Sequence, residues 1–96
     1  MTEEKRKEIK IDFPTSIRGG VYCNHLMVSH TREEFIMDFM MVAPPVGSVT
    51  ARVIMSPGHM KRTIAALQDN FKKYEGKFGQ VKQAAEPAKG PLGFHI

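Results

Sequence analysis

Residues 56–81 read SPGHMKRTIAALQDNFKKYEGKFGQV, and this stretch decides the fold. Apolar side chains recur in it at alternating intervals of four and three residues, which is the period of one face of an α-helix. Seven side chains form this apolar stripe: Met60, Ile64, Leu67, Phe71, Tyr74, Phe78 and Val81. Ser56 is a favourable N-cap, Pro57 suits the first helical position, and Gly79 is a favourable stop. We therefore predict one amphipathic helix from about Pro57 to Gly79.

The residues before the helix predict a small antiparallel β-sheet. Short stretches that are rich in apolar and β-branched residues alternate with turn-forming residues such as Pro14, Gly19 and Gly20. Four strands are expected, at residues 8–13, 21–30, 34–42 and 48–55. The sequence thus predicts an α+β fold in which a four-stranded antiparallel sheet is followed by one long C-terminal helix. We expect the helix to cover the sheet face that carries Phe35 and Phe39.

The third predicted strand, residues 34–42, is apolar on both faces except for Asp38. A strand of this kind is normally covered on both sides, and one helix can cover only one of them. We therefore expect a homo-oligomer, a dimer or a tetramer, or another protein that covers the second face. The interface residues predicted on that face are Ile36, Met40, Val42 and Ile54.

Length and composition fit one small globular domain. The chain has 96 residues, of which 42% are hydrophobic and 25% charged. Residues 1–7 are nearly all polar or charged and are expected to form a flexible arm, residues 8–82 the single domain, and residues 83–96 a flexible tail. The tail is rich in proline and glycine, although Leu92, Phe94 and Ile96 would also suit a docked extended segment. One cysteine, no signal-peptide pattern and no long apolar run lead us to expect a cytoplasmic protein without a membrane partner.

Few residues suggest chemistry. Cys23 and His25 share a strand face, but structural zinc normally requires four ligands in paired clusters, so we expect neither a metal site nor a cofactor. Asp38 lies among apolar residues and needs a partner, which Arg52 on the next strand can supply. A structural cross-strand pair of Asp38 and Arg52 is favoured over a catalytic acid. We expect no catalytic residue, and an enzyme is the least favoured interpretation.

A mild positive charge leaves nucleic-acid binding as an alternative. The formal net charge is +4, and a helix start with free N–H groups can bind an anion. The candidate contacts for an anion or nucleic acid are Arg52, Lys61, Arg62, Lys72 and Lys73. However, Asp69 and Glu75 interrupt this basic surface, and no exposed aromatic residues are interleaved for base stacking. A solvated helix face is therefore the favoured interpretation.

Several short runs resemble a known family of small prokaryotic proteins. The runs are GVYCN at 20–24, VSHT at 28–31, EFIMDF at 34–39, RVIMSP at 52–57, HMKR at 59–62, ALQDN at 66–70 and KYE at 73–75. The family they resemble has no known function, so the resemblance implies no site residues. The predicted order of strands and helix is also similar in topology to the export chaperone SecB. Together these observations favour a non-enzymatic, homo-oligomeric binding protein, either chaperone-like with a polypeptide partner or a scaffold for another protein.

Overall fold

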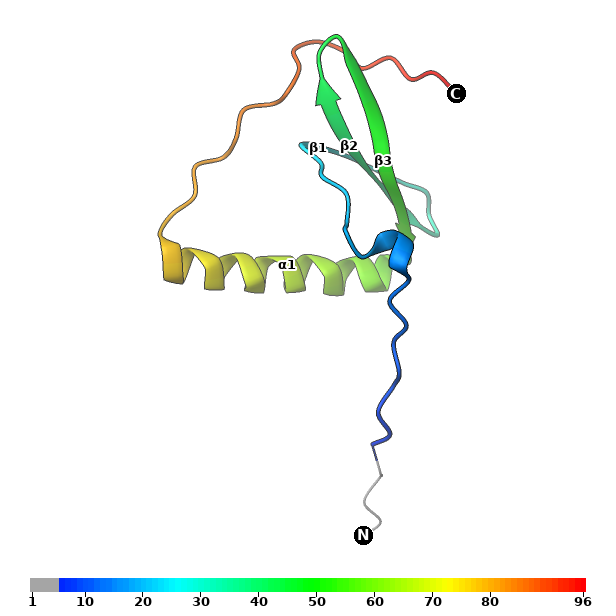
Figure 1. Cartoon of the computed structure of the whole chain (residues 1–96), viewed down its shortest axis with the longest axis vertical. Helices are drawn as coiled ribbons and strands as arrows, with labels where there is room; N and C mark the ends of the chain where they lie inside the picture. Colours follow the sequence, from blue (N-terminus) through cyan, green and yellow to red (C-terminus); the bar gives the residue numbers. More distant parts are fainter. Residues whose placement is uncertain (1–5) are drawn as a thin grey trace.

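The computed structural model describes residues 6–96, so most of the predicted arm 1–7 lies outside the described residues. One short 3₁₀ helix precedes three strands and one long helix (Figure 1). These elements are η1 (Thr15–Ile17), β1 (His25–His30), β2 (Phe35–Ala43), β3 (Val46–Met55) and α1 (Pro57–Phe78). The predicted α+β class and the single C-terminal helix are confirmed.

The sheet has three strands in the order β1-β2-β3, all antiparallel, so the predicted four strands are wrong. The missing strand is residues 8–13, which pair with no strand among residues 6–96. Their alternating pattern suits a strand, but a strand also needs a neighbour to complete its backbone hydrogen bonds. In Figure 1 this segment points away from both the sheet and the helix, where no such neighbour is present.

Local hydrogen bonds stabilise both ends of the β1–β2 hairpin. Between β1 and β2, the Thr31 hydroxyl accepts hydrogen bonds from the N–H groups of Glu33 and Glu34, both at 3.2 Å. Before β1, the side-chain amide of Asn24 exchanges two 2.8 Å hydrogen bonds with the backbone of Val42. The Asn24 side chain thereby takes the hydrogen bonds that the backbone of a longer β1 would make with Val42. This explains why β1 begins at His25 rather than at the predicted residue 21.

A β-bulge interrupts the pairing of β2 with β3. Phe39 pairs with Ala51 and Met40 with Val49, which leaves Thr50 as the extra residue. The Thr50 hydroxyl donates a 3.1 Å hydrogen bond to the Phe39 carbonyl across this irregularity. Bulges bend the strand that carries them.

Both predicted ends of α1 are confirmed. The Ser56 hydroxyl accepts a 3.2 Å hydrogen bond from the His59 N–H, and Pro57 is the first helical residue. Gly79 has a φ of 93°, and its N–H donates to the Glu75 carbonyl at 2.8 Å. A positive φ of this size favours glycine, because a Cβ would clash there with the backbone.

The helix does not cover the sheet, and that prediction is wrong. Figure 1 shows α1 leaving the end of β3 and running away from the sheet. Its first turns alone lie close to β3, where the Thr63 hydroxyl is 3.3 Å from the Met55 sulfur and Met60 is buried. Ser56 is the single residue between β3 and α1, and so short a connection does not turn the helix back across the strands.

The single chain consequently has a very small core. Its buried hydrophobic residues, among those described, are Met37, Met40, Val42 and Met60. The accessible surface is 9513 Å² for a mass of 10.8 kDa, whereas a folded monomer of this mass exposes about 5,500 Å². The radius of gyration is 17.8 Å, against about 12.5 Å for a compact chain of this length. One copy of the chain therefore leaves much of its apolar surface in water.

Candidate functional site

Asp38 and Arg52 form an ion pair between neighbouring strands. They are direct partners in the β2–β3 register, and Arg52 donates from Nε to Oδ1 at 2.6 Å and from Nη2 to Oδ2 at 3.0 Å. The Asp38 residue is 7% exposed, while 62% of the Arg52 side chain remains accessible. The planar guanidinium thus covers both carboxylate oxygens with the two-pronged geometry that it favours.

The hydrogen bonds from Arg52 lower the pKa of Asp38, against the opposing effect of burial, and the same pair raises the pKa of Arg52. Both groups are therefore held in their charged forms. A catalytic acid needs a pKa near the working pH, which is a shift in the other direction. Two hydrogen bonds and opposite charges thus hold Asp38 and Arg52 together across the two strands.

Ligand-forming side chains do not gather within residues 6–96. No three of the described His, Cys, Asp and Glu residues lie close enough together to hold a metal ion. Cys23 is exposed as a free thiol, and it precedes β1, in which His25 is the first residue. The structure therefore does not place these two residues on one strand.

The basic residues of α1 are dispersed, and several have local partners. Lys73 forms a 3.1 Å ion pair with Asp69, and Arg62 donates to the His59 ring at 3.0 Å. Arg52, the fifth candidate contact, belongs to the pair with Asp38. Lys61 and Lys72 are eleven residues apart along the helix, or about 17 Å at the helical rise. The five candidate contacts therefore do not converge on one bound phosphate.

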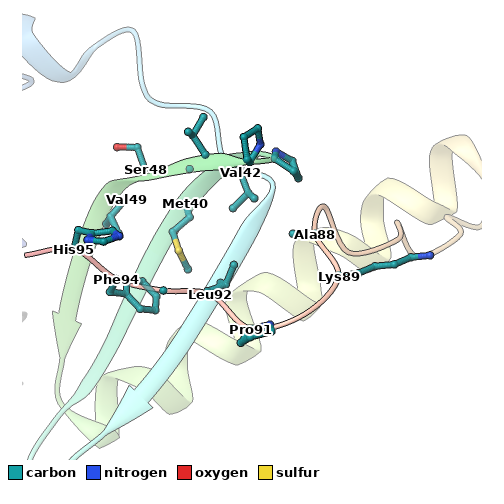
Figure 2. A pocket seen from close by; sticks show the side chains of 15 residues that line it. Met40, Val42, Ser48, Val49, Ala88, Lys89, Pro91, Leu92, Phe94 and His95 are labelled. Carbon is teal, nitrogen blue, oxygen red and sulfur yellow. The ribbon is translucent and has the colours of Figure 1, made fainter.

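The C-terminal tail forms a groove with the outer end of the sheet. Residues from β2, from the Pro44–Pro45 turn, from β3 and from the tail line about 500 Å³. Figure 2 shows Leu92 and Phe94 of the tail lying across the sheet beside Met40. The side chains of Leu92 and Phe94 are apolar, and the tail backbone that carries them is extended. In the sequence, their spacing of two residues was the feature that indicated an extended docked segment. We call this surface the tail groove.

The tail covers part of the face for which the sequence predicted a partner. Met40 and Val42 line the tail groove and are 4% and 8% exposed in the single chain. Ile54, farther along the same face, remains 50% exposed. Half of the predicted interface is therefore already occupied by this chain's own C-terminal segment.

The opposite sheet face, predicted to lie beneath the helix, is largely uncovered, although Met37 on this face is only 8% exposed. Register places Leu26 opposite Phe39, and both Val28 and Val53 opposite Met37, so these side chains share one face. We define the open sheet face by its exposed residues. These are Leu26, Val28, Met41 and Val53, each between 37% and 50% exposed.

The helix carries a second uncovered apolar surface. We define the helix stripe by the residues Ile64, Leu67, Phe71, Tyr74 and Phe78. Leu67 and Phe78 are each 65% exposed, and the other three lie between 47% and 50%. Tyr74 and Phe78 contact each other with ring centroids 4.9 Å apart, so the aromatic end of the stripe forms a continuous surface.

Comparison with known proteins identifies a family but no characterised relative. A family model described as "Protein of unknown function (DUF3467)" matches residues 1–83. No curated protein and no solved structure matches the chain, so the resemblance to SecB has no support. Over residues 6–96 no helix combines the length and hydrophobicity that crossing a bilayer requires.

Proposed function

The chain belongs to the family of proteins of unknown function described as DUF3467, and we propose that it acts as a homo-oligomeric, non-enzymatic polypeptide-binding protein. The observation that carries this proposal is the helix stripe, an amphipathic surface that the single chain leaves in water. Full burial of a Leu or Phe side chain is worth about 1.5–3 kcal/mol, so covering the stripe provides a substantial driving force for association.

A second copy is the occupant that best fits the helix stripe. The surface in excess of a compact monomer is about 4,000 Å² per copy, which is more than the roughly 1,000–2,500 Å² that each partner of a permanent dimer buries. The 22 residues of α1 extend about 33 Å, and the ten residues of β3 extend about the same distance. In a two-fold dimer, each helix stripe can therefore lie along the open sheet face of the other copy, and both surfaces are covered at once.

The tail groove supports the binding part of the proposal. An extended apolar peptide, the Leu92–Phe94 segment of the chain itself, already lies against the sheet there. A partner polypeptide with alternating apolar side chains has the chemistry to occupy the same surface. Met40 in the groove supplies a flexible thioether, which adapts to different apolar side chains.

Sedimentation of the purified chain tests the oligomer. We expect a mass of at least twice 10.8 kDa at micromolar concentration. Leu67→Asp places a charge in the helix stripe and should weaken association at least about 30-fold. Gln68→Asp introduces the same charge on the same helix outside the stripe and should leave the mass unchanged. A wild-type mass near 10.8 kDa would contradict the proposal.

Fluorescence titrations at two salt concentrations test the bound partner. A reduced, unfolded polypeptide should bind with an affinity that salt hardly changes, because the contacts are apolar. Single-stranded nucleic acid should bind weakly or not at all. Tight nucleic-acid binding whose affinity falls steeply with salt would instead favour the alternative function.

A further inference from the structure

The segment 8–13 has the pattern of a strand but no strand partner in the part of the chain that the structure describes. Ile9, Ile11 and Phe13 alternate with polar residues and are 80%, 81% and 58% exposed. In Figure 1 the backbone of the segment projects away from the rest of the molecule. We call residues 8–13 the N-terminal segment. Three large apolar side chains at a period of two are costly in water and are typical of a half-buried strand.

The outer edge of β3 lacks a strand partner, just as the N-terminal segment does. β3 is an edge strand of ten residues that pairs only with β2 among the described elements. Its other side presents backbone N–H and C=O groups without a strand partner. Exposed edges of this length are usually covered or paired, because they otherwise promote uncontrolled association.

We propose that residues 8–13 of one copy add as a fourth strand to the edge of β3 in a second copy. The inference rests on the homo-oligomer proposed above. It commits to a second copy because one chain carries both the unpaired strand and the unpaired edge. In a two-fold assembly each copy then gives its segment to the other, so that both edges are closed and no open edge propagates further.

The side chains favour β3 over β1 as the acceptor. Beyond the bulge, β3 places Ala51, Val53 and Met55 on the open sheet face and Arg52 on the other face. An added strand with Ile9, Ile11 and Phe13 on the open sheet face continues that apolar surface. Its polar residues Glu8, Lys10 and Asp12 carry a net charge of −1 and then lie on the side of Arg52, whose side chain remains 62% accessible beside its pair with Asp38. β1 reads HLMVSH and carries no arginine or lysine to match them.

Hydrogen exchange of the assembled, full-length protein measures this pairing directly. We expect alternate amides of the N-terminal segment to exchange at least about tenfold more slowly than in a synthetic peptide of residues 6–14, since ladder hydrogen bonds protect amides. The outward amides of β3 should be protected to a similar degree. An oligomer in which residues 8–13 exchange like the free peptide would overturn the inference while leaving the proposed function intact.

A proline variant identifies the acceptor edge. Lys10→Pro removes a backbone donor and should abolish protection of the N-terminal segment together with that of the outward β3 amides. Gln83→Pro places proline in another exposed segment outside the helix and strands, and should leave both unchanged. The assignment to β3 is wrong if Lys10→Pro instead speeds exchange of the outward amides of β1. It is also wrong if the variant changes the exchange rate of no amide outside the N-terminal segment.

Discussion

The β2–β3 hairpin and the helix α1 have similar lengths, yet they differ in how they are stabilised within one chain. The hairpin contains the buried residues Met37, Met40 and Val42 and the Asp38–Arg52 pair. Contacts within the same chain therefore bury these side chains. The helix has well-formed caps but only Met60 buried. The difference indicates that the hairpin buries several side chains within one copy, whereas nearly all of the apolar side chains of the helix need a second surface.

The largest expected effect concerns the helix. In the oligomer, Phe71→Ala should lower the free energy of unfolding by about 3 kcal/mol or more, because a buried aromatic side chain is lost. In the single chain Phe71 is 49% exposed, and there the same change should cost far less. Urea unfolding at two protein concentrations separates the cases: the wild-type midpoint should rise with concentration, and the variant should reduce this dependence. A small loss that is independent of concentration would mean that the stripe stays in water.

The hairpin should respond differently to a comparable truncation. Met40→Ala removes a side chain that is 4% exposed and should cost about 2–4 kcal/mol at every protein concentration. Met41→Ala is the comparison, since Met41 lies on the open sheet face and is 38% exposed in the single chain, so its loss should depend on protein concentration. A Met40→Ala loss that varied with protein concentration as strongly as the Met41→Ala loss would show that the tail does not bury Met40.

This contrast also explains which features were predictable from sequence. The bounds of α1, with Ser56 before it and Gly79 after it, depend on local preferences that a few neighbouring residues express. The Asp38–Arg52 pair could be predicted because Asp38 lies among apolar residues and needs a partner, and Arg52 lies on the next predicted strand. The surface that covers the helix does not follow, because an amphipathic period indicates that one face is buried but not against what. The segment 8–13 differs from its prediction for the same reason: its alternation describes one strand, while the pairing depends on a distant edge.

A smaller effect is expected at the start of the sheet. Asn24→Ala removes the two 2.8 Å hydrogen bonds with Val42 and leaves a partly buried backbone N–H and C=O without these partners. We expect a loss of about 1–2 kcal/mol in urea unfolding. Asn24→Asp keeps the acceptor but not the donor and should fall between the wild type and Asn24→Ala. If all three unfold alike, water replaces the side chain at no cost.

Capping of the helix should have a still smaller effect. Ser56→Ala removes the acceptor for the His59 N–H and should lower stability by about 1 kcal/mol. Ser56→Asp restores an acceptor and adds a charge that the helix N-terminus favours, so it should recover most of the loss. Thermal unfolding followed by circular dichroism measures both. Loss of the cap without any change in melting would indicate that the first turn is held by Met60 and its surroundings instead.

The smallest effect expected is a pH dependence that belongs to the hairpin alone. Arg52 lowers the pKa of Asp38 in the folded state, so the folded protein binds the proton less readily than the unfolded chain. The stabilisation is therefore complete above the ordinary value of 3.8 and is lost as the pH falls through the lower folded pKa. Because Arg52 is largely accessible, water screens the pair and the gain in stability is modest.

Urea midpoints between neutral pH and about pH 3 should fall less steeply for Arg52→Gln than for the wild type, since the variant has already lost the charge that lowers the pKa of Asp38. Identical slopes would mean that the guanidinium does not hold the carboxylate in solution, and the hairpin would then depend on its apolar contacts alone.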